Sequence, residues 1–169
     1  RALSKNYDDL TAIELLQLGK SVWEDVNKET LTQAVQYLNR CISLNPKNST
    51  AYAVLADVYY AFIRNNIPLS SASEKSEDNI KKAIKIDPKN SIVITTKFWI
   101  EWDKGDAISS EVLAEEAIRS NPNEPWAIAT YGWYLIINNV DQNKGKEYAG
   151  KALQYCEHPQ GWYYWSFAE

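Results

Sequence analysis

The side chains that most often carry out enzymatic chemistry are scarce in this sequence. The only histidine is His158, beside Pro159, and one imidazole can neither build a zinc site nor complete a Ser-His-Asp set. The two cysteines, Cys41 and Cys156, lack the CxxC spacing of zinc or redox motifs. No GxxxxGK[ST] or GxGxxG segment offers a phosphate cradle. We therefore expect no metal, no cofactor and no catalysis.

The charged side chains follow the pattern of solvated helix faces rather than of reactive pairs. Glu111, Glu115 and Glu116 recur at helical spacing and are interleaved with Arg119. The chain has 18 basic and 22 acidic side chains, so its net charge of −4 would repel a phosphate backbone. No apolar run reaches the roughly 20 residues needed to span a bilayer. We expect this segment to bind neither nucleic acid nor membrane directly.

Aromatic residues are the unusual feature of the composition. The chain has seven Trp and eleven Tyr, more aromatic bulk than a helical scaffold of this size needs. Trp and Tyr supply large, rigid contact areas at a small entropic cost, which makes them typical of binding surfaces. The sequence thus favours recognition of another protein or peptide, and the elements that would position these rings come next.

A phrase that ends in proline recurs along the chain and marks helix ends. It appears as Cys41–Pro46, Ala83–Pro88, Ala117–Pro122 and, more loosely, Ala152–Pro159, and the prolines that end these phrases are spaced 42, 34 and 37 positions apart. Proline cannot continue a helix and disfavours helix in the residue before it, so each phrase closes one unit. A period of about 34 residues of helix, turn, helix and proline is typical of tetratricopeptide (TPR) repeats.

Small and large positions within the units fit this repeat. Gly19 would let two helices approach where a Cβ would hold them apart, and Asn65–Ser73 reads as a longer loop. Phe98 stands where a small residue is usual, so we expect splayed or rotated packing in the third unit. The predicted fold is an all-α, TPR-like right-handed solenoid of about four helix-turn-helix repeats. The array covers residues 11–159 in repeats 11–46, 49–88, 91–122 and 125–159, between a lead-in at 1–10 and a capping helix at 160–169.

Part of the array has a narrower likeness. The segments Ala12–Lys20, Asn27–Thr30 and Ala51–Tyr59 resemble the repeats that follow an OmpR- or ToxR-type winged-helix domain in bacterial regulators. The loop at Asn65–Ser73 is similar to that of the HilA-like activators of invasion and type III secretion genes. The resemblance, which runs over roughly Thr11–Pro88, implies the carboxy-terminal region of a transcriptional regulator of virulence-type genes. Similar repeats also accompany adenylate cyclase and kinase modules, and a free-standing TPR adaptor or scaffold is the alternative.

The first helix of each TPR unit lines the concave face, so counting along those helices predicts the residues that contact a protein or peptide ligand. They are Lys20, Trp23, Asp57, Tyr60, Thr95, Trp99, Trp102 and Trp133. The alternative is that several of these Trp rings are core. Trp99→Ala is expected to weaken partner capture with little change in melting, whereas loss of the fold would place Trp99 in the core.

Two further surfaces bear on the partner. Some TPR proteins hold the carboxylate terminus of a peptide in a clamp of cationic and amide side chains on the first helices of their repeats. Here the corresponding positions carry Leu16, Lys20, Val54, Ile92 and Thr96, of which only Lys20 is cationic, so the clamp is missing. This favours an apolar peptide or a folded protein as the partner. Trp162, Trp165 and Phe167 could instead pair with a second copy in a homodimer, or could fold as a cap on the fourth unit.

The chain begins at Arg1 and lacks Met, which suggests a piece of a longer protein. The unpaired cysteines favour the cytoplasm.

Overall fold

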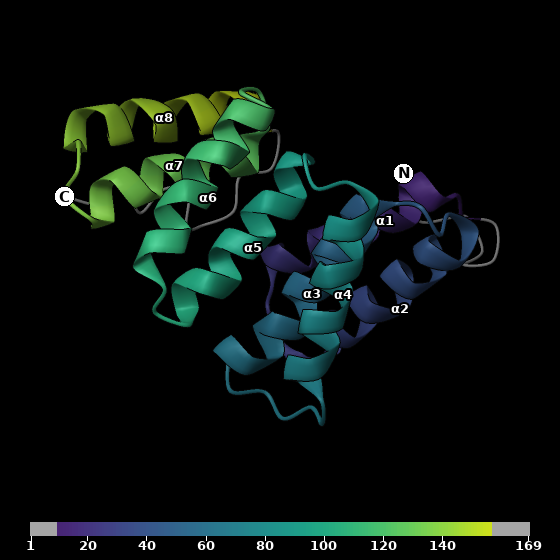
Figure 1. Ribbon diagram of the computed structural model, residues 1–169. Helices are drawn as coiled ribbons and strands as arrows, with labels where there is room; N and C mark the ends of the chain where they lie inside the picture. Colours follow the sequence, from purple (N-terminus) through teal and green to yellow (C-terminus); the bar gives the residue numbers. More distant parts are fainter. Residues whose placement is uncertain (1–9, 157–169) are drawn as a thin grey trace. The chain divides into compact units, whose positions relative to one another are not determined.

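The chain is all-helical in the computed structural model, which describes residues 10–156 (Figure 1). These residues form eight α-helices and one short 3₁₀ helix, with no strand among them. The elements are α1 (Ala12–Lys20), η2 (Ser21–Glu24), α2 (Lys28–Leu44), α3 (Ser49–Arg64), α4 (Ala72–Ile86), α5 (Ser91–Asp103), α6 (Ala107–Ser120), α7 (Pro125–Ile137) and α8 (Gln142–Tyr155). The predicted all-α class is confirmed.

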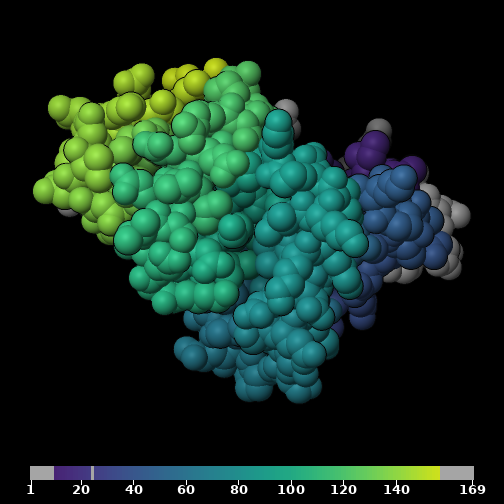
Figure 2. All heavy atoms as spheres, in the orientation of Figure 1, coloured from purple at the N-terminus to yellow at the C-terminus, as the bar shows by residue number. Residues whose placement is uncertain are grey.

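Neighbouring helices pair as hairpins within two compact units. Unit 1 ends at Ile86 and contains the pairs α1–α2 and α3–α4, with α2 also packing on α3. Unit 2 begins at Asp87 and contains the pairs α5–α6 and α7–α8, with α6 and α5 both packing on α7. Side chains fill the spaces between the ribbons of each unit (Figure 2). Each unit therefore consists of two consecutive helix pairs around its own core.

Short polar side chains start most of these helices. Thr11 and Glu14 form a reciprocal capping box at α1, in which the Glu14 N–H donates to Thr11 Oγ1 over 3.3 Å. The helices α2, α3, α5, α6 and α8 begin after an Asn or Asp whose side chain accepts from the first turn. Helix α7 instead has Pro125 at its first position, where a missing N–H costs nothing. The sequence thus sets the helix starts locally.

The recurring proline phrases end helices as expected. Helices α2, α4 and α6 stop two residues before Pro46, Pro88 and Pro122, respectively. The Asn45 N–H still donates to the Cys41 carbonyl oxygen over 2.9 Å, which closes the last turn before Pro46. The fourth phrase, which runs to Pro159, and the lead-in at 1–10 lie partly outside the described residues. The predicted capping helix at 160–169 lies wholly outside them.

Two glycine positions set how closely helices approach. A Cβ on Gly19 of α1 would lie 2.6 Å from Leu38 Cγ and Cδ2 of α2, which confirms the close approach predicted there. A Cβ on Gly132 of α7 would lie 2.9 Å from the Gly145 carbonyl oxygen and 3.0 Å from the Ala149 nitrogen, both in the backbone of α8. The second crossing therefore brings backbone against backbone.

The loop between α3 and α4 is the long, polar one that the sequence indicates. It runs over 65–71, and its second residue, Asn66, has φ 53°, in the left-handed region that Asn tolerates. The Ile67 N–H donates to the Phe62 carbonyl oxygen over 2.8 Å, which caps the end of α3. Asn139 repeats this arrangement after α7, since it has φ 53° and the next N–H, of Val140, donates to the Leu135 carbonyl oxygen.

Candidate functional site

Five aromatic side chains of unit 2 form one continuous cluster, called the aromatic cluster below. Three come from α5 and two from α7: Phe98, Trp99, Trp102, Trp133 and Tyr134. The Trp133 ring centroid lies 4.9 Å from that of Trp99 and 5.0 Å from that of Trp102. The structure therefore brings together three of the eight side chains that the sequence predicted for ligand contact.

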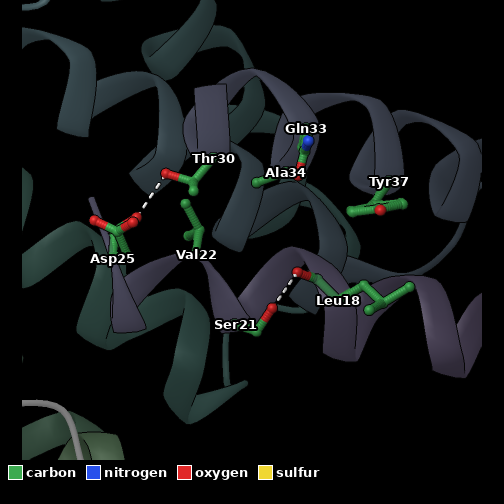
Figure 3. A pocket seen from close by; sticks show the side chains of 8 residues that line it. All are labelled: Leu18, Ser21, Val22, Asp25, Thr30, Gln33, Ala34 and Tyr37. Carbon is green, nitrogen blue, oxygen red and sulfur yellow. Dashed lines mark hydrogen bonds between the residues drawn. The ribbon is translucent and has the colours of Figure 1, made fainter. Parts of the chain in front are cut away.

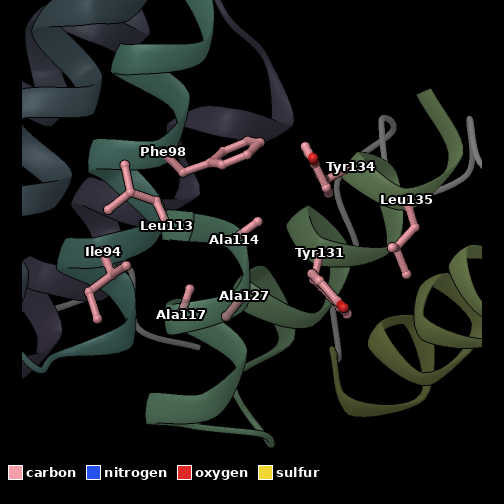
Figure 4. Packing of buried hydrophobic residues seen from close by; sticks show 9 residues of the cluster. All are labelled: Ile94, Phe98, Leu113, Ala114, Ala117, Ala127, Tyr131, Tyr134 and Leu135. Carbon is pink, nitrogen blue, oxygen red and sulfur yellow. The ribbon is translucent and has the colours of Figure 1, made fainter. Parts of the chain in front are cut away.

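The cluster stands on the core of unit 2. Phe98 is 0% exposed and points from α5 toward Tyr134 of α7 (Figure 4). Its ring lies edge-on to Trp99 at 5.2 Å and is stacked with Trp102 at 6.0 Å. Leu113, Ala114 and other small or branched side chains of the same core cluster lie beneath it. The bulky Phe98 thus fills the space where a TPR repeat usually has a small residue, and supports two of the indoles.

The three tryptophans differ in how they are held. Trp99 Nε1 donates to Thr130 Oγ1 over 3.1 Å, and Thr130 is 0% exposed, so this indole is anchored to α7. Trp102 and Trp133 are partly exposed and pack against the core, but neither indole N–H has a hydrogen-bond acceptor among the described residues.

One edge of the cluster is acidic. Burial raises the pKa of the Tyr134 hydroxyl, and the nearby carboxylates of Glu111 and Glu115 on α6 raise it further. The Tyr134 ring also lies 6.4 Å from Trp102, edge-on, so the tyrosine affected by these carboxylates borders the indole of Trp102.

Two of the predicted contact residues are buried, which corrects the prediction. Thr95 is 0% exposed, and its hydroxyl donates to the Ser91 carbonyl oxygen one turn earlier over 2.7 Å. Asp57 is 4% exposed on α3, and its Oδ1 lies 3.9 Å from an Arg64 guanidinium nitrogen. Counting along a helix gives the direction of a side chain but not the depth of its surroundings, so neither residue offers a contact to a ligand here.

Tyr60, predicted beside Asp57, is partly exposed and has the same cation nearby. The Arg64 guanidinium carbon lies 5.4 Å from the centre of the Tyr60 ring. Arg64 therefore links Asp57 and Tyr60 on one face of α3, although the sequence prediction left it out. Its spacing, four residues after Tyr60 and seven after Asp57, is the signal that could have identified it.

The predicted contacts of the first repeat lie where the helix changes type. Lys20 is the last residue of α1, and Trp23 follows in the 3₁₀ helix η2. A 3₁₀ helix has three residues per turn, so counting with the α-helical period misplaces Trp23 relative to Lys20. Both side chains are partly exposed.

A shallow pocket lies in unit 1, and none of the predicted contact residues lines it. It has a volume of about 180 Å³ and lies between α1, η2 and α2, with Val22 and Ala34 in its lining (Figure 3). Ligand pockets usually hold about 300–1,000 Å³. The Ser21 hydroxyl donates to the Leu18 carbonyl oxygen over 2.9 Å, and that of Thr30 to the Asp25 carbonyl oxygen over 2.6 Å. Because these hydroxyls are used within the fold, the aromatic cluster is the stronger candidate.

Metal and thiol chemistry receive no support from the described part of the chain. Between residues 10 and 156, no three His, Cys, Asp or Glu side chains are grouped so that they could hold a metal ion. In the same range, no helix combines the length and apolarity of a membrane span. Both cysteines are free; burial raises the pKa of the Cys41 thiol, which donates to the Ala12 carbonyl oxygen over 3.1 Å.

The predicted self-association residues Trp162, Trp165 and Phe167, and the single histidine, lie outside the described residues. Within them, the sequence prediction missed Phe98, Thr130 and Tyr134 as parts of the site. Thr130 and Tyr134 lie on α7 three residues before and one after Trp133, and no signal in their spacing separates them from ordinary core positions.

Comparison with known proteins identifies the fold. No model of a protein family matches the sequence, and no curated protein matches it. Among solved structures, the chain is similar to TTC0263, a thermophilic TPR protein in Thermus thermophilus, with 16% identity over 100% of this chain and 87% of that one, and a TM-score of 0.67. It is also similar to MamA, with 17% identity over 85% of this chain and 77% of that one, and a TM-score of 0.50. The chain has the fold of TPR proteins, as predicted.

Proposed function

We propose that this chain is a non-catalytic module that binds an extended peptide, or an extended segment of another protein, on the aromatic cluster of unit 2. One observation carries the proposal: two partly exposed indoles, Trp102 and Trp133, lie in contact on the core of unit 2, and neither N–H has an acceptor among residues 10–156. Aromatic anchors of this kind contribute most of the binding energy in many interfaces. Indole N–H groups can also bind backbone carbonyls of an extended chain.

A peptide library tests the proposal. Random twelve-residue peptides displayed on phage are selected on the immobilised chain, and the selected peptides are then measured by calorimetry. Trp102→Ala is expected to weaken binding by about tenfold or more, as loss of an aromatic anchor does. Trp126→Phe is the matched control, because Trp126 lies on α7 outside the aromatic cluster and should leave binding unchanged. Equal binding by wild type and Trp102→Ala would contradict the proposal.

The larger context is a finer proposal that rests on the resemblance over Thr11–Pro88. In it, the chain is the regulatory or assembly region of a cytoplasmic bacterial transcriptional regulator whose winged-helix domain is elsewhere in the parent protein. A free-standing TPR adaptor or scaffold is the alternative. The mass of the parent, recovered from its source cells with an antibody against this chain, separates the two. A parent of several tens of kilodaltons more than 19.3 kDa, with a winged-helix sequence, supports the regulator, and a parent of 19.3 kDa supports the adaptor.

Self-association through Trp162, Trp165 and Phe167 also stays a proposal. Sedimentation equilibrium of the whole chain and of the triple variant with Ser at these positions tests it. A dimer that the triple variant abolishes supports the pairing, and a monomeric wild type contradicts it.

A further inference from the structure

The nitrogen of the Trp99 indole is held by a second helix. Its Nε1–H on α5 donates to Thr130 Oγ1 on α7 over 3.1 Å. Thr130 lies three residues before Trp133, so one turn of α7 carries both the hydrogen-bond acceptor and an indole of the aromatic cluster. The hydrogen bond therefore joins the two helices that supply the cluster.

Three buried threonines of unit 2 differ in the partner of their hydroxyl group. Thr95, Thr96 and Thr130 are each 0% exposed. The Thr95 hydroxyl donates to the Ser91 carbonyl oxygen, which is the bond that threonine commonly forms within its own helix. The Thr96 hydroxyl has no hydrogen-bond partner between residues 10 and 156. Of the three, Thr130 alone accepts from a side chain of another helix.

The angles between the rings of the cluster indicate what this hydrogen bond does. Aromatic pairs prefer stacked or edge-to-face arrangements. Six ring contacts within the cluster follow this preference, with interplanar angles of 17° or of 83–89°. The contact between Trp99 and Trp133 does not, since these rings are tilted by 46° although their centroids are only 4.9 Å apart. The preference of this pair of rings therefore does not explain its angle.

We infer that Thr130 is a positioning residue of the aromatic cluster, whose hydroxyl sets the tilt of Trp99 and thereby the place of Trp133 at the binding surface. This inference rests on the proposed function and names a residue that determines which peptides the cluster accepts. An indole has a single donor, and a donor removed from water without an acceptor costs free energy, so the ring keeps the orientation in which its N–H meets Thr130. Thr130 is fully buried and acts without touching the peptide.

Two substitutions separate the hydroxyl of Thr130 from the shape of its side chain. Thr130→Val keeps the branched shape and loses the acceptor, whereas Thr130→Ser keeps the hydroxyl. Thr96→Val is the matched control, because it makes the same change at a fully buried threonine of α5 whose hydroxyl has no partner among the described residues. The probe is the tightest-binding peptide from the phage selection on wild type, measured by calorimetry. Near-ultraviolet circular dichroism, which depends on the fixed packing of aromatic rings, is recorded for each variant.

We expect Thr130→Val to weaken peptide binding about threefold to tenfold, the usual range for one hydrogen bond, and to change the near-ultraviolet spectrum. Thr130→Ser should restore both, and Thr96→Val should change neither. In a Trp99→Phe background, Thr130→Val should have no further effect on binding, because phenylalanine has no N–H to hold. If urea unfolding shows that Thr130→Val is not folded, Thr130→Ser and Thr130→Ala differ by the hydroxyl alone and provide the same comparison.

The outcomes separate this inference from the proposed function. A folded Thr130→Val variant that binds the peptide as tightly as wild type overturns the inference and leaves peptide binding on the cluster in place. Equal weakening by Thr130→Val in wild type and in Trp99→Phe also overturns it, since the effect would then not pass through the indole. If no selected peptide distinguishes wild type from Trp102→Ala, the proposed function fails, and the role of Thr130 in peptide binding fails with it.

Discussion

The crossing of α7 and α8 gives the sharpest prediction about this fold. In Gly132→Ala, the added Cβ would lie 2.9 Å from the Gly145 carbonyl oxygen, 3.0 Å from the Ala149 nitrogen and 3.0 Å from Tyr148 Cβ. Two of these atoms belong to the backbone of α8, so no rotamer change can relieve the contact. Helix α8 must move away from α7.

Two opposing effects decide the magnitude. Alanine in place of glycine favours a helix interior by about 1 kcal/mol. Overpacking a close contact costs about 1–3 kcal/mol, and the upper part of this range applies here because backbone atoms oppose the methyl group. The free energy of unfolding of unit 2 should therefore fall by about 1–2 kcal/mol, and the melting temperature by about 2–8 °C at the usual conversion for a chain of this size.

Urea and thermal unfolding, followed by circular dichroism at 222 nm, measure this change. Lys146→Ala is the control in the same unit, because Lys146 is exposed on α8 and Ala and Lys have similar helix propensities. The control should shift the free energy by less than about 0.5 kcal/mol. A Gly132→Ala variant that is more stable than wild type would show that the helices separate at little cost, and would refute the reasoning.

Three further predictions concern helix contacts and caps. Gly19→Ala should be more damaging in wild type than in a Leu38→Ala background, because the three atoms nearest to the added Cβ all belong to the Leu38 side chain, at 2.6–3.2 Å; additive unfolding energies would contradict this. Asp141→Ala should lower the free energy of unfolding by about 1 kcal/mol through loss of the α8 cap, as measured in urea, whereas Asp141→Asn should restore it. Hydrogen bonds from the Ser109 side chain and backbone lower the Asp106 pKa below 3.8, so its stabilising effect is present above pH 3.8 and is lost as the pH falls through the lowered value. The melting temperature of Asp106→Asn should accordingly change less than that of wild type over this acid range.

The helices of this fold could be predicted because their signals are local. A proline two residues beyond each of α2, α4 and α6, and an Asn or Asp before most helices, act within one turn of the chain. The close approach at Gly19 could also be foreseen, since a glycine inside a helical pattern usually has a packing reason. These features need no knowledge of which helices meet.

The site was predicted less completely, because it depends on how deeply each side chain is buried and on contacts with side chains of other helices. Helical counting selected Trp99, Trp102 and Trp133, which the structure brings into one cluster, but it also selected Thr95, which is fully buried. It also missed Thr130, because the hydrogen bond that anchors Trp99 joins residues 31 apart in sequence. Side-chain burial is a property of the packed unit, so a single helix cannot reveal it.

Trp99 shows what this difference means for experiments. The sequence alone led us to expect that Trp99→Ala weakens binding and leaves melting nearly unchanged. In the structure, Trp99 packs on Phe98 and Trp133 and donates to the fully buried Thr130, so its removal opens a cavity and leaves that hydroxyl without its indole donor. Replacing a buried Trp by Ala costs about 3–5 kcal/mol, and the partial exposure of Trp99 reduces the expected loss to about 2 kcal/mol.

Urea unfolding of Trp99→Ala and Trp99→Phe checks this expectation. The Phe variant keeps most of the ring packing and loses only the hydrogen bond, so its cost should be about 1 kcal/mol. A melting curve of Trp99→Ala that overlays that of wild type would contradict this expectation and would support the earlier prediction that Trp99 mainly contacts a ligand. If the loss is as large as expected, binding measured with Trp99 variants mixes affinity with stability. Trp102 has no hydrogen bond to lose among the described residues but packs in the same cluster, so the unfolding curve of Trp102→Ala must be compared with that of wild type before its binding is interpreted.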